Sequence, residues 1–494
     1  MRTKRFHPLL MVFEVWQLLK NTFFLVIFLF IMKANSHSLY IKYGRIIFII
    51  FLGLALLYIV LKWMTHTYAL DDRSFHLYQG VFSKTERTIP FSKIQNVTRH
   101  TTLFHRLFQV TSISFETGMN GEDAAVKFDV VSQTEANQME EHMARALRGA
   151  VPDAEIIERM EEDSDSSRII HFKPTKRDVL RASFTSFSFF VIIPILTSFY
   201  FKIDEIFHVN KEAEGIFYNI ISSWWLLTIM VIVFIIISVT FGMVWTFFKY
   251  GKYEISSDQD RIYIAKGIIE ETAFSIAKDR VQAVDIDQSF MKRWLGLAEV
   301  KLTSAGGLDI GEEKSEVNSL YPFLPKERAY EMIAEILPAY KIIPQMQRLP
   351  KKSLWVRLLR PYWIWGIVTI VLYYFKPEVW GVEQAWWLVS AILLFINIAL
   401  RWINFSNTQY VLHDGFIQLK TGSLTTSLFV TKRDKVIEIE ITRNIFQKWL
   451  GLASIEMVNR SKPVKHSGIK DVPVEFADAF YQWYLGRKMD ITIK

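Results

Sequence analysis

The chain has 494 residues, of which 51% are hydrophobic and 15% aromatic, and it contains no cysteine. It is too apolar for an ordinary soluble protein and long enough for several domains, so we expect membrane-spanning segments. The lack of thiols excludes disulfide frameworks, thiolate metal sites and cysteine nucleophiles. A net charge of +8 fits either nucleic acid or an anionic membrane surface, and the apolar spans favour the membrane surface.

Six apolar stretches are expected to cross the bilayer as three helical hairpins. In chain order they are residues 15–32, 44–64, 184–201, 220–248, 361–375 and 385–402. The first is the weakest, because Glu14, Lys20 and Asn21 interrupt the apolar run around it. Lysine and arginine flank the second and third hairpins and acidic residues lie in their loops, whereas the first hairpin shows no bias. This charge pattern predicts that both termini and the segments after each hairpin lie in the cytoplasm.

One sequence block occurs three times. RWLGLAEV at 293–300 returns as KWLGLASI at 448–455, and a diverged form, RLFQVTSI, stands at 106–113. A second block begins at Lys93, Arg280 and Lys435, at the same distance before each copy. Equal spacing across the chain indicates an internal repeat, with one copy after each hairpin.

Each repeat is expected to be a small antiparallel sheet or barrel. Alternating apolar and polar residues at 261–265 and 415–419 are typical of half-buried strands, and Gly80, Gly267 and Gly422 stand where hairpin turns are needed. Residues 134–147, 325–337 and 473–485 then show the spacing of an amphipathic helix. Each repeat therefore predicts strands followed by one helix.

These residues resemble a known family. The segment IPFSKIQNV at 89–97, within a triple arrangement of hairpin and sheet, resembles the second bacterial pleckstrin-homology (PH)-like domain family, and the chain layout is similar to the YdbT-type membrane proteins of Gram-positive bacteria. The resemblance implies a strongly bent, seven-stranded antiparallel sheet, or barrel, capped by a C-terminal helix. The first repeat departs from the pattern, with Gln109 where the others have Gly296 and Gly451, and with no tryptophan.

The fold class expected is thus an α+β membrane protein with six transmembrane helices. The segments expected are hairpin 1 at 1–64, PH-like domain 1 at 65–150, a linker at 151–183, hairpin 2 at 184–248, domain 2 at 249–340, an amphipathic linker at 341–360, hairpin 3 at 361–403 and domain 3 at 404–494. The resemblance brings no established chemistry with it.

Candidate catalytic groups are few. The paired acids Asp71-Asp72 and the acidic run at 161–163 have no companion base at a defined spacing, so we interpret them as solvated charges. His100 and His105 lack a third metal ligand. We therefore expect a protein that is not an enzyme, with no cofactor and no metal.

The repeated basic and aromatic block gives the candidate interaction surface, which comprises Arg106, Arg293, Trp294, Lys448 and Trp449. In one interpretation the tryptophans fill the sheet core and the glycines permit a tight turn. In the other, the basic residue and the tryptophan lie at an exposed rim and contact lipid headgroups or a partner. The sequence is compatible with both interpretations.

The function expected is that of a multi-pass scaffold at the cytoplasmic face of the plasma membrane, acting in envelope stress or resistance to membrane-active agents. The sheet units would bind proteins or each other, and exposed strand edges would take up a peptide or a paired domain by strand addition. The partners expected are the anionic inner leaflet and a smaller membrane protein with the same domain, and not nucleic acid. The alternative is a lipid-handling or transport protein that uses the six helices.

Overall fold

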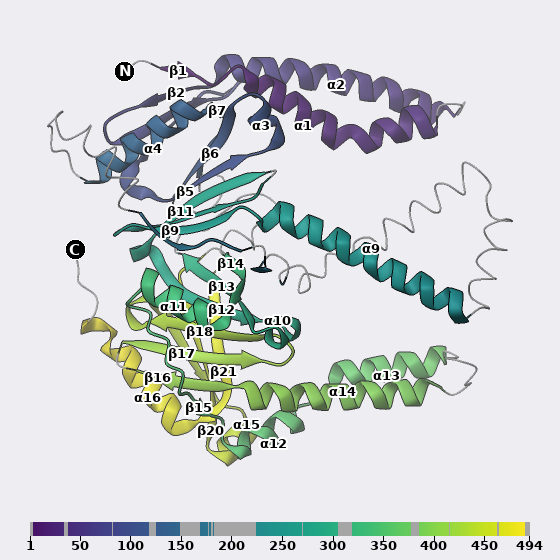
Figure 1. Ribbon diagram of the computed structural model, residues 1–494, viewed down its shortest axis with the longest axis vertical. Helices are drawn as coiled ribbons and strands as arrows, with labels where there is room; N and C mark the ends of the chain where they lie inside the picture. Colours follow the sequence, from purple (N-terminus) through teal and green to yellow (C-terminus); the bar gives the residue numbers. More distant parts are fainter. Residues whose placement is uncertain are drawn as a thin grey trace. The chain divides into compact units, whose positions relative to one another are not determined.

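The computed structural model describes residues 3–33, 38–81, 83–117, 125–148, 168–175, 177–178, 181, 224–268, 270–304, 319–376, 385–413, 415–461 and 464–489. The protein is α+β, with long apolar helices and antiparallel sheets (Figure 1). It divides into two compact units. Unit 1 holds Met1–Ile169 and Tyr263–Ile276, and unit 2 holds Ile170–Ile262 and Ala277–Lys494.

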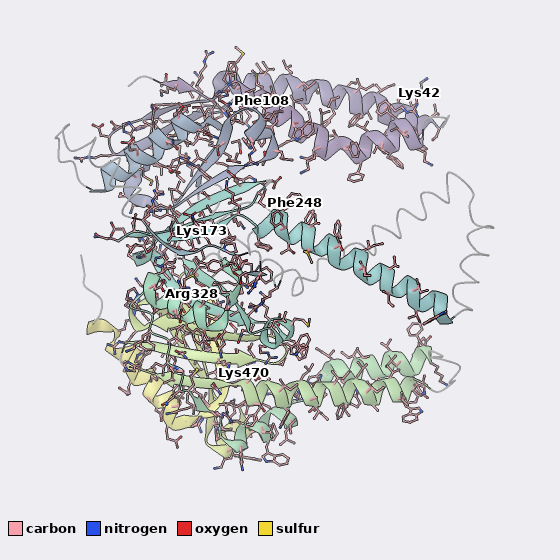
Figure 2. All side chains as sticks on the ribbon, viewed as in Figure 1. Lys42, Phe108, Lys173, Phe248, Arg328 and Lys470 are labelled. Carbon is pink, nitrogen blue, oxygen red and sulfur yellow. The ribbon has the colours of Figure 1, made fainter. Side chains whose placement is uncertain are left out.

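The first membrane hairpin belongs to unit 1. It consists of α1 (Leu9–Val26), which runs on into the π-helix η1 (Ile27–Met32), and α2 (Leu39–Thr65). The helix begins before residue 15, so Glu14 lies inside it, and the Lys62 ammonium lies 2.8 Å from the Glu14 carboxylate. Figure 2 shows Lys42 at the far end of this hairpin and Phe108 near the end that meets the sheets. Glu14, one of the residues that interrupt the apolar sequence, thus forms an ion pair with the second helix.

The long helices of unit 2 are α9 (Trp224–Tyr250), α13 (Trp363–Phe375) and α14 (Ala385–Asn407), with α12 (Lys351–Leu359) before α13. In the described part of the chain, four segments are long and apolar enough to cross a membrane: Leu9–Ile31, Leu39–Thr65, Lys351–Phe375 and Ala385–Asn407. Helix α9 covers most of the stretch expected at 220–248, and the stretch at 184–201 lies outside the described residues. Six spans in three hairpins therefore stay a prediction.

The first repeat forms two sheets in unit 1. Its strands are β1 (Lys4–Arg5), β2 (Thr67–Leu70), β3 (Ser74–Gln79), β4 (Thr85–Pro90), β5 (Ile94–Thr101), β6 (Val110–Thr117) and β7 (Ala125–Ser132). Strands β1 to β4 pair in that order, and β5, β6 and β7 form the second group. Helices α3 (Leu103–Leu107) and α4 (Gln133–Arg148) follow β5 and β7. Phe75, Phe115 and Phe128 pack between the sheets, and Met139 of α4 joins them in the core.

The second and third repeats have the same element order. The second comprises β8 (Ile169–Phe172), β9 (Tyr253–Ser257), β10 (Arg261–Lys266), β11 (Glu271–Ala277), β12 (Val281–Gln288), α10 (Phe290–Trp294), β13 (Leu297–Ser304), β14 (Ser319–Pro325) and α11 (Lys326–Ile336). The third comprises β15 (Gln347–Arg348), β16 (Gln409–Leu412), β17 (Phe416–Gly422), β18 (Thr426–Lys432), β19 (Val436–Thr442), α15 (Ile445–Leu450), β20 (Leu452–Asn459), β21 (Lys465–Pro473) and α16 (Val474–Leu485). Short 3-10 turns are η2 (Phe91–Lys93), η5 (Lys278–Arg280), η7 (Arg433–Lys435) and η8 (Gly486–Met489).

The helix after the last strand of each repeat confirms the expected strand-then-helix order. Ala477, Phe480 and Trp483 of α16 are buried in the core of the third repeat. Closure of a barrel end by these helices stays a prediction. The turn glycines are also confirmed: Gly422 has φ 123°, and a Cβ there would lie 2.0 Å from the carbonyl oxygen of Thr425. Only glycine fits such a turn without moving the backbone.

The sheets are not confined to single repeats. In unit 1, β11 of the second repeat pairs antiparallel with β5 of the first. In unit 2, β12 of the second repeat pairs antiparallel with β18 of the third, which gives the order β14-β13-β12-β18-β17-β16-β15. The expectation of a small antiparallel sheet for each repeat is therefore incomplete, because the sheets extend across neighbouring repeats. The physical reason is that a small bent sheet leaves backbone N–H and C=O groups unpaired at its edge, and the neighbouring repeat satisfies them.

Candidate interaction surface

Each copy of the repeated block begins at the end of a short helix, α3, α10 or α15, and runs on into the next strand. The three helices have an N-cap residue at the same repeat position. The hydroxyls of Thr102 and Ser289 accept hydrogen bonds from backbone N–H groups three residues on, at 3.4 and 3.3 Å. The Asn444 side chain accepts one from Gln447 N–H at 2.7 Å. Threonine, serine and asparagine are the residues that begin helices well, because their side chains satisfy these N–H groups. The helix position is therefore set by local sequence.

The inner face of each short helix bonds to the strands. His105 donates from Nε2 to the Asp129 carbonyl oxygen at 2.8 Å, and the Lys292 ammonium lies 2.8 Å from the Glu299 carboxylate. Gln447 donates to both Ser454 and Asp471 at 2.8 Å. Three different residue types at one repeat position thus each link the short helix to the strands.

The two histidines considered as metal ligands have structural partners. Burial of His105 lowers the pKa of its imidazole, so the ring is neutral near pH 7. His100 lies on β5, where its Nδ1 is 3.0 Å from the hydroxyl of Thr272 on β11. Among the described residues no group of three metal-ligating side chains occurs.

The outer face of each short helix is apolar and exposed. Trp294 is 76% exposed and Trp449 79%, and Leu107, which takes their place in the first repeat, is 77% exposed. The first residue of each helix, Leu103, Phe290 or Ile445, is also exposed. The interpretation that the tryptophans fill the sheet core is therefore wrong. Exposed apolar side chains thus occupy the same positions in all three repeats.

Each of these helices lies beside elements that lead to the membrane. In unit 1, the ring of Phe104 on α3 packs against Phe13 of α1, with centroids 5.5 Å apart. In unit 2, Phe323 contacts both Tyr250 at the end of α9 and Lys292 of α10. The exposed apolar faces thus lie close to the points where long apolar helices meet the sheets, and tryptophan favours the membrane interface.

The basic residues of the block have a different role from the tryptophans. Arg106 donates to the carbonyl oxygen of Ile268 and to the Glu271 carboxylate, both at 2.9 Å. Arg293 donates to the carbonyl oxygens of Ser423 and Leu424 at 3.1 and 2.9 Å. Both acceptor segments are hairpin turns of the following repeat. Arg106 and Arg293 therefore join repeats, whereas Trp294 and Trp449 are exposed.

Two strand pairs link neighbouring repeats, β5 with β11 and β12 with β18, and we call these pairs the joints. Asn96 pairs with Ile276 in the first joint, and Ala283 with Thr431 in the second. These are equivalent positions of the repeat, so both joints have the same register. Sequence reasoning missed the joints because each short strand pattern shows which face is apolar and says nothing about the neighbour along the edge.

A buried charged network fastens the third repeat to its membrane helices. Asp471 is fully buried, and its carboxylate accepts from Arg357 at 3.2 Å and from Arg360 at 2.7 Å. Arg357 also donates to Asn404 of α14 and to Thr408, which follows the helix. Two arginines and Gln447 compensate the single carboxylate, as a buried charge requires. The amphipathic stretch expected at 341–360 thus holds α12, which is bound to the sheet as well as leading to α13.

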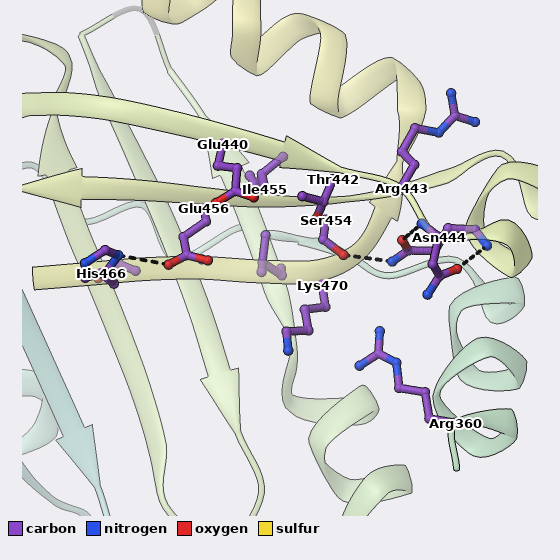
Figure 3. Close-up of a pocket in the computed structure, with 14 residues that line it drawn as sticks. Arg360, Glu440, Thr442, Arg443, Asn444, Ser454, Ile455, Glu456, His466 and Lys470 are labelled. Carbon is purple, nitrogen blue, oxygen red and sulfur yellow. Dashed lines mark hydrogen bonds and ion pairs between the residues drawn. The ribbon is translucent and has the colours of Figure 1, made fainter.

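An open pocket of about 680 Å³ lies on the third repeat, along β19, β20 and β21 (Figure 3). Glu440 and Thr442 of β19 line it, together with Glu456 and His466, whose side chains lie 3.0 Å apart. Most of the residues that line it are polar or charged, and the charges are of both signs. The pocket therefore suits a polar strand or loop beside β19 better than an apolar ligand.

Comparison with known proteins decides the family. The family model for the bacterial PH domain matches residues 23–147, 192–340 and 365–488, which together make up most of the chain. The chain belongs to the bacterial PH domain family. It is 24% identical over 502 residues to the transmembrane protein YdbT of Bacillus subtilis (strain 168), with 99% of each chain covered. No solved structure matches the chain.

The three family matches confirm both the resemblance and the internal repeat. They fall on the three bacterial PH repeats and include parts of the apolar segments before them. With its apolar helices and whole-length similarity to YdbT, the chain is a transmembrane protein. The family does not define an activity, because PH-like folds carry many unrelated functions at different sites.

Proposed function

We propose that the protein is a non-enzymatic scaffold at the membrane surface, whose bacterial PH repeats bind protein strands along their sheet edges. The observation that supports this most is the pair of joints, in which one repeat binds the next by strand addition in one register. Such main-chain pairing gives affinity without requiring a particular side-chain sequence. The partner that fits best is a membrane protein with the same domain, and a smaller one was expected from the layout.

We propose that the short helices hold the repeats against the bilayer. Trp294 and Trp449 would lie at headgroup level, where aromatic rings are favoured, and Lys448 would face anionic lipids. The lysines and arginines that flank the second and third hairpins support a cytoplasmic position for the repeats and both termini. At the level of the cell, such a scaffold would act in envelope stress or resistance to membrane-active agents.

The test is mild crosslinking in the native membrane, followed by mass spectrometry of the proteins that copurify. The comparison is Trp294→Ala/Trp449→Ala, which removes the exposed rings and leaves the joints intact. A defined membrane-protein partner, retained with the wild type, is the expected result. If a specific lipid copurifies and no protein does, the scaffold proposal fails and lipid handling replaces it.

A further inference from the structure

We propose that β19 of one copy of the chain pairs with β4 of a second copy, so that copies join head to tail. This inference rests on the proposed scaffold function and names the occupant of the strand edges. Strand β19 of the third repeat and β4 of the first repeat are equivalent to the strands that pair in the two joints.

The two joints leave two strand edges over, one equivalent to β5 and β12 and one equivalent to β11 and β18. Strands β5 and β12 each pair with a strand of the following repeat, whereas β19, their equivalent, is the outer strand of the sheet β19-β20-β21 in the described part of the chain. Strand β4, the equivalent of β11 and β18, is likewise the outer strand of the sheet β1-β2-β3-β4. The first six residues of β12 are buried, whereas the central residues of β19 are exposed or half-buried. Strand β19 is therefore an edge of the type that the other repeats cover.

The register of the joints can be transferred to these two edges. The repeat aligns Ala283 with Glu438, and Ile276 with Ile89, so the same register places Glu438 opposite Ile89. Further along the strands, Glu440 then faces Arg87 and Thr442 faces Thr85. An acidic residue thus meets a basic one, which stabilises a cross-strand pair. Pro90, which has no N–H, falls outside the paired positions, as its equivalents do in both joints.

The basic residue of the short helix completes the match. Arg106 and Arg293 each bind a carbonyl oxygen of the hairpin turn in the following repeat, close to Gly267 and Gly422. Lys448 is their equivalent, and it is exposed, with no such turn contact in the part of the chain that the structure describes. In the proposed joint the Lys448 ammonium would bind the turn at Gly80 of the next copy. All three elements of a joint are therefore present, divided between the two ends of the chain.

A second copy of the chain carries both edges, so its β4 can pair with β19 of the first copy and its β19 can pair with β4 of another. The contact uses different surfaces on the two copies, so each copy that joins offers a further edge of the same type. Membrane anchoring confines the copies to one plane, which raises their effective concentration. The proposal is thus a repeating contact between identical chains, made by the interaction that already links the repeats.

Disulfide trapping tests the register directly, because the natural chain has no cysteine. Thr85→Cys and Thr442→Cys are made as separate full-length variants with different tags, coexpressed and oxidised in the membrane. The equivalent pair in the first joint, His100 and Thr272, has side-chain atoms 3.0 Å apart, so His100→Cys/Thr272→Cys within one chain is the positive control. Glu86→Cys with Thr442→Cys is the matched negative control, since neighbouring strand residues point to opposite faces.

The expected result is a disulfide-linked dimer that contains both tags only when Thr85→Cys and Thr442→Cys are together, with loss of this dimer on adding Lys448→Glu. A chain with both substitutions should give a ladder of higher species. The proposal is overturned if the positive control forms its bond while no mixed dimer appears, or if single variants dimerise alone. A bond within one chain of the double variant, without a ladder, also overturns it. If no mixed dimer forms, a membrane protein can still copurify in the crosslinking experiment that tests the scaffold function. The failure of this proposal and the failure of the scaffold proposal can therefore be distinguished.

Discussion

Gln447 and Trp449 share the short helix α15, yet the side chain of Gln447 is buried against Asp471 and that of Trp449 is 79% exposed. The inner face of the helix joins a network that ties sheet, α12 and α14 together, whereas the outer face has no role in the core. The same contrast recurs between His105 and Leu107 in the first repeat. The short helix therefore has two different faces, one bonded to the strands and one exposed.

The largest effect is expected at the centre of the inner face. Asp471→Ala removes the only carboxylate that faces Arg357 and Arg360 in this network and leaves buried positive charge uncompensated. We expect a loss of about 3–5 kcal/mol of unfolding free energy. Thermal or denaturant unfolding in detergent, followed by circular dichroism, measures it. Asp478→Ala, at an exposed position of α16, is the control and should change stability by less than about 0.5 kcal/mol. An equal loss of stability in both variants would show that the network around Asp471 does not stabilise the repeat.

A smaller effect is expected at Gln447. Gln447→Ala deprives the Asp471 carboxylate of one donor and removes the cap contact to Asn444, for about 1–3 kcal/mol. Gln447→His introduces the residue that occupies this position in the first repeat, and it should recover part of the loss. Unfolding midpoints of the three proteins give the comparison. If Gln447→Ala equals the wild type, the inner face does not stabilise the repeat.

The end of the short helix gives a paired test between repeats. Gly451 and Gln109 occupy the same left-handed conformation, with φ 67° and 54°. Since no atom lies within 4 Å of a Cβ built on Gly451, Gly451→Ala should cost about 1 kcal/mol through the backbone alone. Gln109→Gly should stabilise by a similar or smaller amount. Unfolding curves should show that Gly451→Ala lowers the free energy of unfolding and that Gln109→Gly raises it. A change in the same direction for both variants would contradict this prediction.

Acid should weaken the first repeat through His105. Burial lowers the pKa of this histidine in the folded state, so below its ordinary value of 6.5 the unfolded chain binds more protons than the folded one. Stability should therefore fall as the pH decreases from 6.5 towards the lowered folded pKa. His105→Gln, which copies Gln447, should reduce this slope when unfolding is measured between pH 7 and pH 5. An unchanged slope would assign the acid sensitivity to other groups.

The smallest effect on stability is expected on the outer face. Trp449→Ala should change the unfolding free energy by less than about 0.5 kcal/mol, because the ring is exposed. Its effect should appear in membrane contact instead. A spin label on Trp449→Cys, in a nanodisc of anionic lipid, should report headgroup depth, whereas a label on Tyr481→Cys of α16 should report water. Equal exposure of both labels to an aqueous relaxation agent would exclude the interfacial role.

Much of the local structure could be read from the sequence. The apolar runs predicted α2, α13 and α14 closely, because a membrane helix needs only length and hydropathy. Gly80, Gly267 and Gly422 marked hairpin turns, since their backbone conformation is closed to other residues. The start of α1 was placed too late, because Glu14 and Lys20 made the run look interrupted, and the ion pair with Lys62 was not visible from spacing.

The sequence by itself determined the number of repeats, the order of strands and helix in each, and the apolar segments between them. These depend on periodicity and on single-residue conformations, which are local properties of a chain. Only the tertiary structure decided that β5 pairs with β11, that β12 pairs with β18, and that Trp294 and Trp449 face outward. Strand edges bond through backbone groups that every residue carries, so their partners are set by three-dimensional geometry and leave little trace in side-chain pattern.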